Sequence, residues 1–223
     1  MATTNFAKPM QSDLQPGWDL PVRLFHWAVV VLIGFSWWSA EERRLDWHRY
    51  SGYAVLTLIL FRLAWGIGGS ATARFSSFVR GPSAVASYVA RDMFTRTRPV
   101  TIGHNPVGGW SVLAMLAAML VQTTLGLVAV DVDGIESGPL SGWVSFETGR
   151  LASKLHGISF KILLGLVALH VAAIFFYLVH KRANLVGQMW FGQGKGAPAP
   201  LGGAVILLLL FAGAVWALVT FGG

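Results

Sequence analysis

Two histidines in one apolar stretch, running from Leu155 to Val179, carry the first hypothesis about chemistry. His156 and His170 are fourteen residues apart. On an α-helix this spacing is about 3.9 turns and a rise of roughly 21 Å, so both imidazoles leave the same face at different depths of a bilayer core about 30 Å thick. Because histidine inside a membrane span is costly, such a pair indicates metal ligands or a proton path. One helix could therefore hold two haem groups. The alternative is that both rings only form hydrogen bonds to neighbouring helices.

The composition places the chain in a membrane. Of its 223 residues, 54% are hydrophobic and 12% are charged, which is too apolar for the surface of an ordinary soluble domain. The chain has no cysteine. This excludes disulfides, cysteine-ligated iron–sulfur clusters and covalently attached c-type haem. Any haem would be bound non-covalently.

Apolar stretches of spanning length define the elements that must position the histidines. They cover about 22–40, 48–67, 107–130, 154–180 and 201–221. We expect an all-α membrane protein, in which a four-helix transmembrane bundle binds two haems and one extra C-terminal transmembrane helix follows. The predicted parts are an N-terminal segment (1–21), the dihaem bundle (22–192), and a linker with the fifth helix (193–223).

The connections between the spans have predicted structures of their own. Residues 45–49 form a short charged turn and 131–150 a polar loop. The apolar spacing after Pro82 predicts a short helix lying on the inner membrane surface.

Charge asymmetry orients the predicted bundle, because cytoplasmic connections collect lysine and arginine. Between Arg62 and Arg98 there are six arginines and one acid, whereas the connection at 131–150 holds four acids and one arginine. The N-terminus is then cytoplasmic and the C-terminus periplasmic. The first twenty residues are polar, so we expect a cytoplasmic N-terminal segment and no cleavable signal peptide. The net charge of +7 is mostly a topology signal, and no nucleic-acid partner is expected.

Depth in the membrane pairs the histidines. The first span enters from inside, which places His26 near the inner leaflet, and the second enters from outside, which places His48 near the outer leaflet. The fourth span runs inward, with His156 near the outer face and His170 deeper. Depth therefore pairs His26 with His170, and His48 with His156. Each pair would supply both axial ligands of a b-type haem, an arrangement suited to electron transfer because no iron position stays open for substrate.

The remaining two histidines are not paired by depth. His104 and His180 both fall at cytoplasmic ends of spans, where water can solvate them. We interpret them as surface histidines or as contacts to haem propionates.

Arginines and one lysine near the span ends are further candidates for binding residues. Guanidinium groups could hold haem propionates, or they could only anchor the spans at the interface; these are Arg23, Arg49, Arg62 and Arg74. Lys161 lies five residues beyond His156. It could snorkel to the outer headgroups, or face a propionate, a quinone or an anionic substrate.

Glycines near the ligand face could make room for porphyrin, or could simply allow close helix packing. They are Gly34, Gly52 and Gly165.

Several segments together resemble the bacterial cytochrome b561 and nickel–iron hydrogenase b-type cytochrome family. They are WDLPVRLFHW, WHRYSGY, FRLAWG, GHNPVGGW and LHGISFKILLGLVALH. The likeness runs in this order from about Trp18 to Gly192, which is most of the chain. The resemblance implies a four-helix, two-haem cytochrome of the bacterial inner membrane, with ligands at His26, His48, His156 and His170. It gives His104, in GHNP, no ligand role. Two features depart from the family pattern, namely the fifth helix and Lys161. The charge of Lys161 weakens a direct assignment as a hydrogenase subunit.

Three functions remain open at this stage. The first is a dihaem cytochrome that carries electrons between a membrane quinone and a periplasmic redox partner, such as a c-type cytochrome or a hydrogenase. The second is a superoxide:ubiquinone oxidoreductase, as some family members suggest, with Lys161, Arg43 or Arg49 steering the anion. The third is a haem-free membrane subunit whose histidines satisfy one another.

Overall fold

The computed structural model describes residues 17–95, 105–133, 135–192 and 199–222, and its regular structure there is helical apart from one isolated bridge between Val130 and Ser137. Within these residues, five helices are long and apolar enough to cross a membrane. They are α1 (Leu20–Glu41), α2 (Leu45–Gly68), α5 (Pro106–Val128), α6 (Phe146–His180) and α8 (Leu201–Phe221). The predicted all-α membrane class is confirmed.

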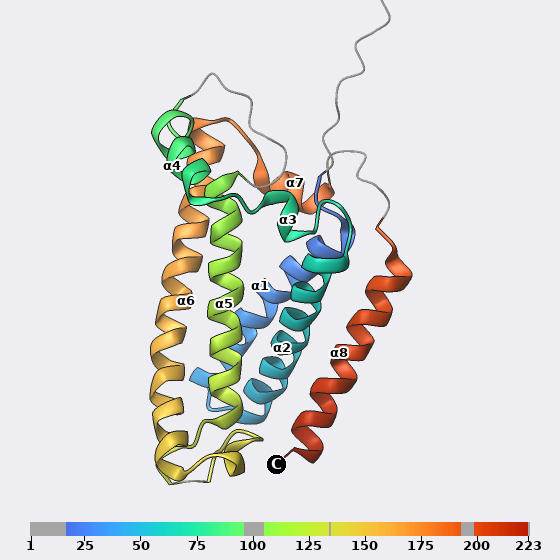
Figure 1. Cartoon of the computed structure of the whole chain (residues 1–223). Coiled ribbons are helices and arrows are strands. Elements are labelled where there is room, and N and C mark those ends of the chain that lie inside the picture. The colour runs from blue at the N-terminus through green and yellow to red at the C-terminus, as the bar shows by residue number, and fades with distance from the viewer. Residues whose placement is uncertain (1–16, 96–104, 134, 193–198, 223) are drawn as a thin grey trace, which may run out of the picture.

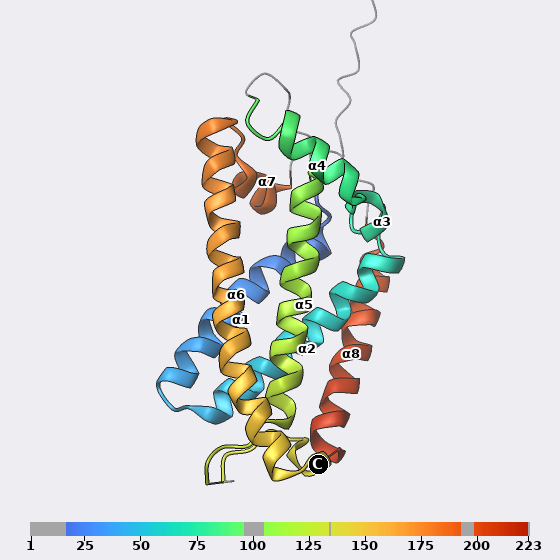
Figure 2. The ribbon, with the colours of Figure 1, turned by 60° about the vertical axis from the view of Figure 1, so that its left-hand side comes forward.

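The spanning helices pack as two antiparallel pairs with α8 outside them. α1 packs against α2, α5 packs against α6, and α2 also contacts α5. α1 and α2 are tilted relative to the upright pair α5 and α6 (Figures 1 and 2). A shared apolar core joins the four helices, with Val29, Val55, Ile59, Leu116, Met119 and Leu163 at its centre. α8 lies along α2 on the side away from α6 (Figure 1).

Polar caps fix where three of these helices begin. Asp19 precedes α1, Asn105 precedes α5 and Ser145 precedes α6, and the side chain of each accepts a hydrogen bond from a backbone N–H of the first turn. Such caps satisfy donors that a helix start otherwise leaves unpaired. Proline in the first turn of α1 and of α5 needs no such partner, because it lacks the N–H.

Two helix starts differ from the prediction. α6 begins at Phe146, eight residues before the predicted span at 154, and so takes the end of the expected 131–150 loop into a 35-residue helix. α2 begins at Leu45 and includes the expected charged turn at 45–49. Both predictions were wrong because apolar residues mark the membrane-embedded part of a helix, whereas caps and turns mark its ends.

Short helices lie at both ends of the bundle. At one end are α3 (Phe75–Phe78), α4 (Pro82–Arg91) and α7 (Leu185–Phe191) (Figures 1 and 2). The predicted short helix after Pro82 is confirmed as α4. The opposite end holds the α1–α2 turn, where Arg43 has a φ of 55°, and the 3-10 helix η1 (Ser141–Trp143).

A partly buried set of hydrogen bonds holds α4 against the bundle. The Tyr177 hydroxyl of α6 accepts a hydrogen bond from Asn105 Nδ2 at 2.7 Å and is hydrogen-bonded to the Tyr88 hydroxyl of α4. Lys181 Nζ donates to the backbone oxygens of Asp92 and Thr95, just beyond α4.

Candidate functional site

The structure brings together the two histidine pairs that depth had matched. His48 of α2 and His156 of α6 have ring centroids 6.0 Å apart, and His26 of α1 and His170 of α6 have ring centroids 6.4 Å apart. If opposed nitrogens of two imidazoles bound one metal ion, each at about 2 Å, their ring centroids would be about 6 Å apart. The spacing of both pairs therefore fits axial ligation of one haem iron each.

Backbone carbonyls orient the rings of the His48–His156 pair. Nδ1 of His48 lies 2.9 Å from the Ser36 carbonyl oxygen, and Nδ1 of His156 lies 2.9 Å from the Gln122 carbonyl oxygen. Because a carbonyl can only accept, the proton of each neutral ring sits on Nδ1, which leaves a lone pair on Nε2. This is the tautomer that binds a metal through Nε2. In His156 the Nε2 lone pair accepts a hydrogen bond from Gln122 Nε2 at 3.0 Å, which an iron ion would have to replace.

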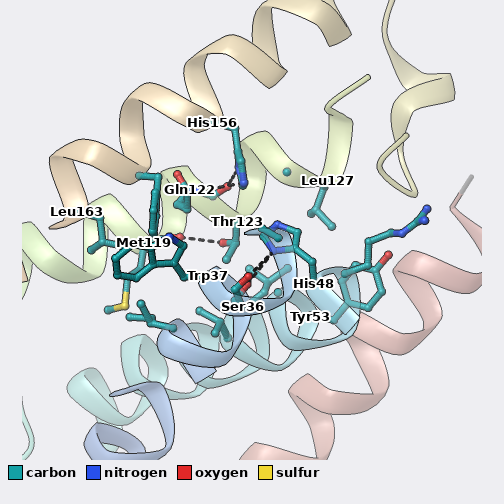
Figure 3. A pocket seen from close by; sticks show the side chains of 18 of the residues that line it. Ser36, Trp37, His48, Tyr53, Met119, Gln122, Thr123, Leu127, His156 and Leu163 are labelled. Carbon is teal, nitrogen blue, oxygen red and sulfur yellow. Dashed lines mark hydrogen bonds between the residues drawn. The ribbon is translucent and has the colours of Figure 1, made fainter. Parts of the chain in front are cut away.

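A cavity of about 260 Å³ is lined by both the His48 and the His156 side chains (Figure 3). By the same measure, one water needs roughly 10–15 Å³. Much of its lining is apolar, including Ile33, Leu56 and Leu163, as a porphyrin face requires.

Glycines keep part of this cavity open. Gly52 and Gly157 line it, and a Cβ built on either one meets nothing within 4 Å. Gly34 and Gly165, the other glycines singled out in the sequence, have the same open space at the Cβ position. Together with the donor set, these positions fit a flat cofactor held between the two histidines.

Four residues around the His48–His156 pair were missed from the sequence. Gln122 and Ser36 supply the carbonyl acceptors, and the Ser159 hydroxyl donates to Gln122 Oε1. Gly126 packs so closely that an added Cβ would lie 3.1 Å from His156 Cε1. No pattern distinguishes a serine, glutamine or glycine of this kind within an apolar helix, because its role depends on which neighbouring helix it faces.

The surroundings of the His26–His170 pair are different. Nδ1 of His26 is buried, and it has no hydrogen-bond partner among the described residues. The neighbouring ring of Trp27 meets His26 edge-on, with centroids 5.0 Å apart, and also meets Trp190 of α7 at 4.9 Å. Aromatic and apolar contacts therefore dominate this site.

Arg62 is the most deeply buried of the predicted arginines, with 2% of its surface exposed. It lies fourteen residues after His48 on α2, the same spacing as between His156 and His170. Its guanidinium carbon lies 4.9 Å from the Phe75 ring centroid, and its Nη1 has no hydrogen-bond partner among the described residues. A buried guanidinium with a free donor is suited to an anionic ligand such as a propionate.

The other predicted arginines differ in their contacts. Arg49 lines the cavity but forms ion pairs with Glu136 at 2.6 Å and Asp46 at 3.3 Å. Arg23 donates to the backbone oxygens of Met189 and Trp190 at the end of α7. Arg74 is exposed and precedes α3.

The remaining candidates lie away from both histidine pairs or outside the described residues. Lys161 is exposed on α6, without an ion pair to any described residue. His180 Nε2 lies 3.0 Å from the Phe94 carbonyl oxygen, and its ring stacks on Phe176. His104 lies outside the described residues.

Comparison with known proteins identifies the family. The family model for prokaryotic cytochrome b561 matches residues 17–192, which include α1 to α7 and both histidine pairs. No curated protein and no solved structure matches the chain. The match and the apolar helices support a multi-pass membrane protein that transfers electrons through b-type haem. The chain therefore belongs to the prokaryotic cytochrome b561 family.

Proposed function

We propose that the protein is a dihaem cytochrome of the bacterial inner membrane that carries electrons between a membrane quinone and a periplasmic redox partner, such as a c-type cytochrome or a hydrogenase. The observation that carries the proposal is the presence of two histidine pairs, with ring centroids 6.0 and 6.4 Å apart, on helices that cross the membrane. When bound, each haem b supplies a site that gains and loses one electron.

The chain's own residues would hold the haems at two depths. His48 and His156 would bind the iron of the outer haem, and His26 and His170 that of the inner haem. Because α6 carries one ligand of each pair, its rise places His156 and His170 at depths that differ by roughly 21 Å.

Arginines supply charge around the two proposed sites. Arg62 is buried without a carboxylate partner within ion-pair distance among the described residues, and is our choice for a propionate of the inner haem. Arg49 lines the outer cavity and would have to share its guanidinium between Glu136 and a propionate. Arg23 and Arg74 are weaker candidates, because the first binds carbonyl groups of α7 and the second is exposed.

Electron transfer across sealed vesicles tests this function. Protein reconstituted with ubiquinone in the membrane is offered a reduced c-type cytochrome from the periplasmic side, and oxidation of that cytochrome is followed by absorbance. We expect transfer in the parent and in His180→Ala, whose ring is outside both pairs, but not in His48→Ala or His170→Ala. Equal rates in all four proteins would contradict the proposal.

Superoxide is the alternative electron donor. Of the cations proposed to steer the anion, Arg49 lines the cavity but is paired with two carboxylates, so its charge is largely neutralised and attracts an anion less strongly. Lys161 and Arg43 are exposed and do not line the cavity. We therefore place superoxide second. Rapid haem reduction when purified protein is mixed with superoxide, together with slow reduction by the c-type cytochrome, would reverse this order.

A further inference from the structure

We propose that hydrogen bonding of the ligand histidines makes the outer haem the lower-potential haem, so that electrons run downhill from the outer site to the inner one. The inference rests on the proposed function, since it concerns the two haem sites defined there. It adds an order of potentials and a direction, and it assigns positioning roles to Ser36, Gln122 and Gly126.

The first step concerns the outer ligands. Both His48 and His156 donate from Nδ1 to a backbone carbonyl at 2.9 Å, the first to Ser36 and the second to Gln122. Such a bond draws the Nδ1 proton away and raises the basicity of the nitrogen that binds the metal. A more basic ligand stabilises ferric iron more than ferrous iron, so the reduction potential of the outer site falls.

The second step concerns the inner ligands. Nδ1 of His26 is shielded from solvent and meets no acceptor among the described residues. Its neighbours are the rings of His170 and Trp27. Without a carbonyl acceptor, His26 is a weaker donor to ferric iron than His48, so the inner site keeps the higher potential.

Charges act in the same direction as the hydrogen bonds. The outer cavity is lined by Glu41 and by Arg49, whose charge is offset by Glu136 and Asp46. Arg62, fourteen residues after His48 on α2, is a buried cation whose charge is only partly offset by the buried Asp19, which lies beyond ion-pair distance. Negative charge favours the oxidised outer site, and positive charge favours the reduced inner site.

The direction of transfer follows from these two potentials. One electron that leaves the outer site oxidises it and reduces the inner site, with no other reactant required. The chain would thus pass electrons from the end carrying η1 and the α1–α2 turn towards the end carrying α4 and α7.

Redox titration of single-site proteins tests the order of potentials. His26→Ala combined with His170→Ala leaves only the outer site, and His48→Ala combined with His156→Ala leaves only the inner site. Each protein is titrated by visible absorbance in the same detergent. We expect the two reduction equilibria to differ at least tenfold, which is about 59 mV for one electron, with the outer site lower. Equal or reversed potentials would overturn the proposal.

Gly126→Ala tests the cause in the otherwise intact protein. The new Cβ would lie 3.1 Å from His156 Cε1 and 3.4 Å from its Nδ1, so the ring must shift and its bond to the Gln122 carbonyl weakens. We expect the lower potential to rise and the higher one to stay. The matched control is Gly203→Ala on α8, where a Cβ meets nothing within 4 Å, and it should move neither potential.

The outcomes separate the inference from the function beneath it. If the parent does not bind two haems, the proposed function is wrong, and there are no two reduction potentials to compare. If it binds two haems but Gly126→Ala leaves both potentials unchanged, the dihaem cytochrome stands and the hydrogen-bond account is wrong.

Discussion

Arg62 combines deep burial with an incomplete set of partners. Its side chain is 2% exposed, its guanidinium lies over the Phe75 ring, and Nη1 meets no acceptor among the described residues. Burying an incompletely paired charge costs several kcal/mol, and the buried Asp19, beyond ion-pair distance, offsets only part of that cost. A guanidinium kept at such a cost, on the half of α2 towards the inner histidine pair, is better explained by a ligand than by packing.

Replacing Arg62 by methionine separates these two roles. If the guanidinium holds a propionate, Arg62→Met should weaken binding of the inner haem about 10–100-fold, the range for losing a supporting contact at a metal site. The haem-free protein should be equally or more stable, because the buried charge is gone. Haem content per chain and thermal unfolding measure both effects. Arg80→Met, at an exposed arginine, is the control, and full haem content in Arg62→Met would refute the role.

Gly52 offers a second test at the residue scale. It lines the outer cavity, and a Cβ there meets no protein atom within 4 Å. Gly52→Leu should therefore fill the space meant for the outer haem without a clash inside the protein. We expect haem content to fall from two per chain to about one while the fold is kept, as judged by circular dichroism. Gly202→Leu on α8 is the matched control. Retention of two haems in Gly52→Leu would contradict the proposal that the outer haem occupies the cavity lined by Gly52.

Which histidines lie close together could be predicted at this scale, but the groups that orient their rings could not. A histidine in an apolar span is costly and therefore conspicuous, and topology alone matched His26 with His170 and His48 with His156. The acceptors at Ser36 and Gln122 are backbone carbonyls, which every helical residue possesses. Which carbonyl is free to accept depends on how helices cross, and a single sequence does not contain that information.

Helix ends and helix packing form the next scale. Five spans were predicted, and the structure has a helix at each, but α6 starts at Phe146 because Ser145 caps it there. The apolar pattern could not predict that start, since the first turns of α6 carry Glu147 and Arg150 outside the apolar region. α3 and α7 were also missed, being too short to show a helical period.

The fifth helix contributes packing to the bundle and no side chain to the outer cavity. Ala204 is buried against Val22, Phe61 and Trp65. Ala204→Leu should therefore overpack this contact and destabilise the protein by about 1–3 kcal/mol, while haem content stays at two per chain.

Thermal unfolding and haem content of purified Ala204→Leu check this prediction. Ala214→Leu, at an exposed position of the same helix, controls for the added side chain. Loss of haem in Ala204→Leu alone would mean that α8 helps to form a haem site.

At the scale of the whole molecule, the two ends of the bundle differ in charge. Described residues at the α4 end include more basic than acidic groups, namely Arg23, Arg74, Arg80, Arg91, Lys181 and Arg182 with Asp19 and Asp92. The opposite end is richer in acids, namely Glu41, Glu42, Asp46, Asp131, Asp133, Glu136 and Glu147, with Arg43, Arg44, Arg49 and Arg150. By the positive-inside rule, the α4 end faces the cytoplasm.

Because the chain has no cysteine, single cysteines can report this orientation. Asp133→Cys, in the loop before η1, should react with an impermeant maleimide in intact spheroplasts. Ser83→Cys, on α4, should react only after the membrane is permeabilised. The reverse pattern would invert the topology and exchange the outer and inner assignments of the two histidine pairs.

The most direct test is whether His26 with His170, and His48 with His156, each bind one haem. The pyridine haemochrome assay measures this haem stoichiometry on the parent, His48→Ala and His170→Ala. We predict two haems per chain in the parent and about one in each variant, with a different haem lost from the reduced-minus-oxidised spectrum in each case. One haem or none in the parent, or two haems retained in either variant, would contradict the account.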